Sequence, residues 1–248
     1  MIIALILFLA AFLPGIWIIY KKRPVWFNMK YLLVFAGAYI FSITIVHILP
    51  EVFEGSNQPR TAALFVLLGF FMQIFLDYLT SGVEHGHEHL HHHSHGFSSP
   101  LLLMIGLCLH ALMDGAILVH PVDNIHGSVL SHTYGLLLGI VLHKIPAALA
   151  LMAVLMTVYR DRRALLAMLL IFSLASPVGY VFSEYLNQSN LMGHQGFLLV
   201  FALVSGNFLH ISTTIFFESS PDHSFHRKKI FISLLGAALA VLMEFSHH

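Results

Sequence analysis

The sequence predicts an all-α membrane protein with eight transmembrane helices, and three observations support this fold class. Hydrophobic residues make up 58% of the 248 residues and charged residues only 10%, whereas soluble domains carry about 25% charged residues. The hydrophobic residues form continuous runs of about the length that a helix needs to cross a bilayer. Strand-like alternation over ten-residue blocks is absent, which argues against an outer-membrane barrel. Because backbone polar groups in lipid must be satisfied within their own segment, helices are the expected spanning element.

Each of the eight apolar runs is expected to form one helix. The first has no basic residues before it and no small-residue cleavage site after it, so we interpret it as a helix and not as a signal peptide. No long linker divides the chain, so residues 1–248 are expected to form a single transmembrane domain that contains a histidine-rich loop at 84–97. The runs, of which the last is short, span residues 2–20, 31–50, 61–80, 99–119, 134–158, 163–186, 196–217 and 230–245.

The basic residues predict the orientation, because cytoplasmic loops of membrane proteins carry an excess of Lys and Arg. If the N-terminus lies outside, the loops after the first, fifth and seventh helices face the cytoplasm, and they hold ten of the twelve basic residues. With eight spans, both termini are then expected outside a cell (inner) membrane. The ten residues are Lys21, Lys22, Arg23, Lys30, Arg160, Arg162, Arg163, Arg227, Lys228 and Lys229.

Nineteen histidines are a large excess, and one group of them forms the tract EHGHEHLHHHSH at 84–95, between the third and fourth helices. Imidazole and carboxylate are ligands that zinc takes. We expect the tract to contact metal on the cytoplasmic side but not to define a transport site, because it has no apolar pattern that would fix its geometry. Its histidines are His85, His87, His89, His91, His92, His93 and His95.

A second group of ionisable residues lies within the predicted helices. His110 and Asp114 are spaced i, i+4 in the fourth helix and so share one face, and His143 lies in the fifth helix. An ionisable residue within a bilayer is costly and by default marks a pathway or a site. Two imidazoles and one carboxylate give three ligands to a tetrahedral zinc ion and leave the fourth position for water or a passing ligand. An inter-helix hydrogen bond is the alternative role of each histidine alone, but the three residues together favour a metal site.

Three further positions are candidates for the pathway of the ion. His47 and Glu51 lie at the outer end of the second helix, where they either receive metal from outside or reach toward water at the interface. His210 lies in the inner part of the seventh helix, where a ligand would help an ion to leave. A hydrogen bond to a neighbouring helix explains His210 nearly as well.

The ordered pair HALMDG at 110–115 and HKIPAAL at 143–149 resembles the fourth-helix and fifth-helix signatures of the ZIP family of metal transporters. The resemblance implies eight helices with both termini outside, arranged as a core of the fourth and fifth helices between two three-helix repeats of inverted topology. It also implies that zinc, iron or manganese moves toward the cytoplasm, with His110, Asp114 and His143 as ligands. Similar segments in the second, sixth and seventh helices are GAYIFSITIVHILPE at 37–51, SLASPVG at 173–179 and SGNFLHISTTIFFE at 205–218.

The sequence departs from many ZIP members at three positions. Ala111 stands where many members have Asn or another polar residue, and Ala147 where many have Glu or His. Ser176 stands where many have Glu. These positions hold a second, bridging metal in binuclear members, so only one metal site is carried over to this chain.

Lys144 follows His143 directly, as in a subgroup of the family with HKxPAA in the fifth helix. Neighbouring side chains on a helix point about 100° apart, so the lysine cannot share the ligand face. Its long stem can bend back, and Asp114 is the nearest expected partner for its buried charge. We therefore expect Lys144 to take the place of a second ion.

Two other functions are compatible with buried His and Asp residues. An intramembrane zinc hydrolase of lipid amides would bind zinc with such residues and activate a water molecule, but the HxxxH pattern of these enzymes is missing from the last three predicted helices. A metal sensor that does not move ions is the other alternative, although the sequence contains no soluble signalling domain. We therefore expect a transporter and not an enzyme.

The expected partners are a divalent metal ion and the lipid bilayer, with no resident cofactor. The sequence does not separate zinc from iron or manganese, because affinity follows the Irving–Williams order and selectivity comes from geometry. The single cysteine, Cys108, excludes an intrachain disulfide and a cysteine-based metal cage,. No basic stripe indicates nucleic acid, and a homodimer is left open.

Overall fold

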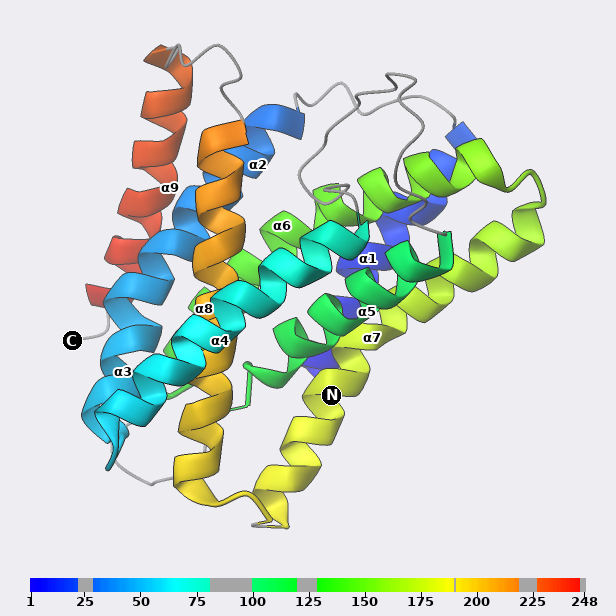
Figure 1. Cartoon of the computed structure of the whole chain (residues 1–248). Coiled ribbons are helices and arrows are strands. Elements are labelled where there is room, and N and C mark those ends of the chain that lie inside the picture. Colours follow the sequence, from blue (N-terminus) through cyan, green and yellow to red (C-terminus); the bar gives the residue numbers. More distant parts are fainter. Residues whose placement is uncertain (22–28, 81–99, 120–128, 190, 219–226, 246–248) are drawn as a thin grey trace.

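The computed structural model describes residues 1–21, 29–80, 100–119, 129–189, 191–218 and 227–245, nearly all of them helical (Figure 1). The described helices form eight rods. One rod consists of α2 (Met29–Ile43), the π-helical turn η1 (Thr44–Ile48) and α3 (Leu49–Gly55) in series. The other rods are single helices, namely α1 (Ile2–Lys21), α4 (Pro59–Thr80), α5 (Pro100–Ala116), α6 (Val129–Val158), α7 (Arg162–Gln188), α8 (Gly193–Glu218) and α9 (Arg227–Phe245).

These rods confirm the predicted all-α fold, since each predicted run corresponds to one rod. Within the described residues, six helices are long and apolar enough to cross a membrane. The apolar part of α5, Leu102–Ala116, is shorter, and α9 does not fall within the set of six. The number of long apolar helices makes the chain a multi-pass membrane protein.

Exposed apolar side chains show which rods face lipid. In α4 only 22% of the most apolar window is buried, whereas in both α6 and α8 the buried share is 61%. Leu64 and Phe71 on α4 and Ile171 and Phe182 on α7 are more than half exposed. Soluble proteins rarely expose such continuous apolar surface. The helices α4 and α7 therefore lie at the periphery of the bundle, and α6 and α8 lie inside it.

The most extensive contacts between different rods follow the two-fold pattern expected of inverted repeats. The helix α4 packs on α8, and α9 packs on α2; likewise α5 packs on α7, and α6 packs on α1. If the first three rods correspond in order to the last three, and α5 corresponds to α6, each of these contacts maps onto its counterpart. The packing thus agrees with the predicted 3+2+3 arrangement.

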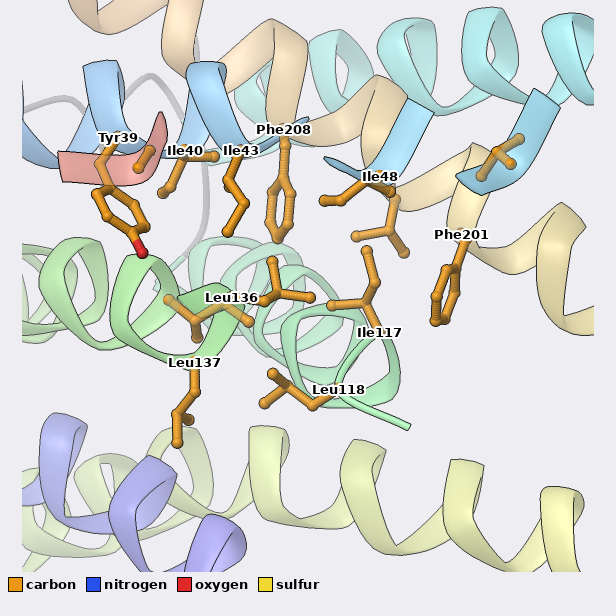
Figure 2. Packing of buried hydrophobic residues seen from close by; sticks show 14 of the residues in the cluster. Tyr39, Ile40, Ile43, Ile48, Ile117, Leu118, Leu136, Leu137, Phe201 and Phe208 are labelled. Atoms are coloured by element: carbon orange, nitrogen blue, oxygen red, sulfur yellow. The ribbon is translucent and has the colours of Figure 1, made fainter. Parts of the chain in front are cut away.

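Two apolar clusters hold the rods together. The first lies among α1, α5, α6 and α7 and includes Leu107, Met152 and Phe172. The second joins α2, η1, α6, α8 and the end of α5, and Figure 2 shows Phe208 and Ile48 in it. Within a bilayer, where lipid tails are as apolar as these side chains, such clusters stabilise the bundle through close van der Waals packing.

The helices α5 and α7 come close together because each offers a glycine at the contact. A Cβ atom at Gly115 would overlap the backbone carbonyl of Ser176, and one at Gly179 would overlap that of Leu112. Small residues that let backbones approach are typical of helix packing within membranes. The contact brings Ser176 against the polar face of α5.

Candidate metal centre

The i, i+4 spacing places His110 and Asp114 on one face of α5, as the helical period requires. The Nε2 atom of His110 lies 3.6 Å from Oδ1 of Asp114. Both side chains are almost fully buried, with residue exposures of 4% and 1%. A buried carboxylate is costly unless it is paired or binds a cation.

His143 reaches the same carboxylate from α6. Its Nε2 atom lies 3.4 Å from Oδ2 of Asp114. Its Nδ1 atom lies 3.1 Å from the carbonyl oxygen of Gly139, one turn earlier in α6. Donation from Nδ1–H to this carbonyl places the proton on Nδ1 and leaves the Nε2 lone pair facing Asp114. This hydrogen bond therefore prepares Nε2 as a ligand atom.

The three side chains form a group of donors that fits one ion. One ligand atom from each of His110, Asp114 and His143 lies within 4.8 Å of the others. Ligands at the usual zinc distances stand about 3.3 Å apart around a tetrahedral ion. Among the described residues, neither Oδ1 of Asp114 nor Nε2 of His143 has a hydrogen-bond partner, although both atoms are buried. A cation between them would satisfy both atoms.

Lys144 lies on α6 next to His143, and its side chain links the group to α7. Its Nζ lies 3.3 Å from Oδ2 of Asp114 and donates a hydrogen bond to Oγ of Ser176. The Ser176 hydroxyl in turn donates to the carbonyl oxygen of Ala111 at 2.5 Å. Nζ also lies 5.6 Å from the centre of the Phe172 ring, within cation–π range,. Contacts with Asp114, Ser176 and Phe172 thus fix the ammonium group beside the carboxylate.

Asn207 was not predicted from the sequence. It lies on α8, and its Nδ2 atom is 3.2 Å from Nδ1 of His110. Its Oδ1 atom is buried and has no hydrogen-bond partner among the described residues. A lone Asn in an apolar helix gives no periodic signal, and only its side-chain contact with His110 links it to the site. The only signal in the sequence is its place in the segment 205–218 described above.

The other predicted residues lie apart from this group. His47 and Glu51 lie beside Glu244 of α9, with His47 Nδ1 3.2 Å from Glu244 Oε1. His210 Nε2 lies 2.7 Å from Oδ2 of Asp77 on α4, the kind of inter-helix contact that was the alternative for this residue. The histidine tract at 84–95 lies outside the described residues.

Comparisons with known proteins identify the family that the sequence resembles. A family model described as "ZIP Zinc transporter" matches residues 80–244, more than half of the chain. The chain is 28% identical over 169 residues to zinc transporter ZIP9 of Xenopus tropicalis, covering 64% of this chain and 53% of that protein. It is 31% identical over 127 residues to zinc transporter ZIP9 of Micropogonias undulatus, covering 50% of this chain and 40% of that protein. The chain thus spans about half the length of the curated relatives it matches.

Proposed function

Because this chain belongs to the ZIP zinc transporter family, we propose that it carries Zn²⁺ across a membrane through one intramembrane site. The ligands of the ion are His110, Asp114 and His143. The observation that carries this proposal is the convergence of their three donors, all buried, from α5 and α6. The matched family region, residues 80–244, contains all three residues.

The donor set suits a borderline divalent ion that must bind and then leave. Two neutral imidazoles and one carboxylate supply three ligands, and the fourth position of a tetrahedral ion stays open to water or to the next ligand along the path. Fe²⁺ and Mn²⁺ accept the same ligand types, so they are alternative cargoes. The ion is a substrate in this account and not a resident cofactor, and the protein is a carrier and not an enzyme.

Lys144 limits the site to a single ion. A second divalent ion would need carboxylate or amide ligands, and the chain has Ala111, Ala147 and Ser176 at the positions where many family members supply them. The ammonium of Lys144 lies where it neutralises Asp114 when no metal is bound. A metal that arrives at Asp114 must displace this contact, which weakens binding and favours release.

Asn207 sets the tautomer of His110. When Nδ2 of Asn207 donates to Nδ1 of His110, the proton of the imidazole lies on Nε2, which then cannot bind metal. A half-turn of the amide presents Oδ1 instead, which accepts from Nδ1–H and frees the Nε2 lone pair. Outer carboxylates and carbonyls orient metal-binding histidines in this way in many sites. Asn207 is therefore a positioning residue that switches with metal loading.

The charges of the loops predict the orientation of the protein in the membrane. Transport runs toward the cytoplasm of a cell (inner) membrane, with both termini outside. Residues 1–248 act as one transmembrane domain, and the loop at 84–97 collects or regulates metal on the cytoplasmic side. The partners are the ion and the bilayer, and a homodimer stays open.

Uptake into proteoliposomes tests the proposal. Purified protein should accumulate zinc well above protein-free vesicles, and parallel measurements with iron and manganese, with and without a pH gradient, define the cargo. Absence of uptake of all three ions by correctly folded protein would overturn the proposal. Lipid-amide hydrolysis by the same preparation would favour the hydrolase alternative, and zinc binding without uptake would favour a sensor.

A further inference from the structure

His47 lies in the π-helical turn η1 and is buried in the bundle. It belongs to a different helix from His110, Asp114 and His143. In η1 the backbone N–H of Leu49 donates to the carbonyl of Thr44, five residues earlier, instead of four. Pro50 follows in the next turn and has no N–H to continue the regular pattern. Single π-turns inside α-helices occur frequently at functional sites. Here the turn leaves the His47 side chain only 10% exposed.

Two carboxylates flank the His47 imidazole, one at each ring nitrogen. Glu244 Oε1 of α9 lies 3.2 Å from Nδ1, a hydrogen-bond distance. Glu51 Oε2 of α3 lies 3.6 Å from Nε2, which is too long for a hydrogen bond. Among the described residues no donor bonds to Glu51 Oε2, although the atom is buried. At this separation both atoms can bind one cation that lies to the side of the line joining them.

The separation also matches the geometry of a zinc ligand pair. Donor atoms around a tetrahedral zinc ion stand about 3.3 Å apart, close to the 3.6 Å between His47 Nε2 and Glu51 Oε2. Metal-binding histidines almost always donate their other ring N–H to a carboxylate, carbonyl or water. Glu244 holds that position. His194, in the first turn of α8, interacts electrostatically with Glu51 and offers a further imidazole.

The group of His47, Glu51 and Glu244 is separate from the core site. It contributes no donor to the group of His110, Asp114 and His143. Ile48, next to His47, lies in one apolar cluster with Phe208, as Figure 2 shows. The Phe208 ring lies 6.4 Å from the ring of His143. One apolar cluster thus extends from the residue next to His47 to a ring beside His143.

We propose that His47 and Glu51 form a second divalent-metal site, a capture site at the outer end of the bundle, with Glu244 as the residue that orients His47. The proposal rests on the proposed transport function for its role, since it takes ions from outside and passes them to the core site. The end of α3, the start of α8 and the end of α9 lie opposite the predicted cytoplasmic loops.

Zinc dependence of uptake tests the role of the site. Glu51→Gln removes the charge of one ligand and keeps its shape, so KM for external zinc should rise about tenfold or more with kcat within twofold. Glu244→Leu, which removes the acceptor beside His47 Nδ1, should also raise KM, because loss of an orienting partner costs about 10–100-fold in metal affinity. The control is Glu54→Gln, an exposed carboxylate on the same helix, which should leave KM unchanged. An unchanged KM for Glu51→Gln in a folded, active carrier would overturn the proposal.

Equilibrium binding separates failure of this site from failure of transport. The full chain with Asp114→Ala keeps the histidine tract, so tract-bound zinc cancels in a comparison with the Asp114→Ala/Glu51→Gln double variant. The double variant should bind one zinc less per chain, at a zinc concentration that saturates the single variant. Equal binding by the two proteins would refute the outer site whether or not the protein transports. If the double variant binds one zinc less but the unmodified protein takes up no zinc, the outer site is supported and the proposed transport function is overturned.

Discussion

The ammonium of Lys144 and the carboxylate of Asp114 form an ion pair inside the bundle, with Nζ 3.3 Å from Oδ2 and both side chains 1% exposed. The pair joins α6 to α5 at the point where two imidazoles also meet the carboxylate. Breaking a buried pair by removing one partner usually destabilises a protein by about 3–5 kcal/mol. Under the proposed function, a divalent ion replaces the lysine as the partner of Asp114.

Replacement of Lys144 should therefore strengthen metal binding and slow release. Lys144→Met removes the charge and keeps most of the stem, so we expect zinc affinity to rise on the order of tenfold, a change of about 1.4 kcal/mol, and turnover to fall. Zinc binding and uptake rates measure the two effects, with exposed Lys228→Met as the control. Unchanged affinity and turnover would reduce Lys144 to a structural residue.

Variants of Asn207 should show whether the residue acts as a hydrogen-bond acceptor for His110 or only fills space. Asn207→Leu keeps the volume but loses the oxygen that accepts from His110 Nδ1–H, so zinc affinity should fall about 10–100-fold. Asn207→Asp keeps an acceptor and should bind zinc at least as well as the unmodified chain. Zinc titration of both proteins checks this difference. Equal losses in the two variants would contradict the role in setting the tautomer.

The glycine contact between α5 and α7 should be intolerant of a single methyl group. Gly179→Ala would place a Cβ atom against the carbonyl of Leu112, and such overpacking destabilises by about 1–3 kcal/mol. Gly135→Ala on α6 is the matched control, because its nearest neighbour, an Ile43 side-chain atom, lies at 3.4 Å. Thermal unfolding in detergent should show a lower midpoint for Gly179→Ala alone. Equal midpoints for the two variants would contradict the close approach of the backbones.

The histidine tract should modulate transport without being required for it. Deletion of residues 85–95 should keep zinc uptake, with a changed apparent affinity as the expected effect. The shortened protein should bind fewer zinc ions per chain than the full chain, and the difference gives the number of ions that the tract binds. A correctly folded deletion that takes up no zinc would place the tract within the pathway.

The rods were predictable because the length of an apolar run is a direct property of the sequence. The same holds for the shared face of His110 and Asp114, which follows from their spacing on one helix. The π-turn at Thr44–Ile48 was not predictable, because nothing in the local pattern separates it from a regular helix. It places His47 against Glu244, 197 positions away.

Roles that depend on contacts between helices were the hardest to predict. Asn207 gains a role only because α8 presents it to His110 on α5. His210 lies beside Asp77 because α4 and α8 pack along their length. In both cases the sequence gives a polar residue in an apolar helix, and the partner is set by packing alone.

Zinc uptake by Asp114→Asn tests the central claim most directly, because Asp114 contacts His110, His143 and Lys144 at once. The amide has nearly the shape of the carboxylate but lacks the charge that holds a divalent ion. The control is Glu184→Gln, which removes a carboxylate whose hydrogen bond to Gln188 on α7 is solvent-exposed. We predict uptake at the level of protein-free vesicles for Asp114→Asn and normal uptake for the control. Uptake by folded Asp114→Asn at the unmodified rate would show that the ion crosses elsewhere.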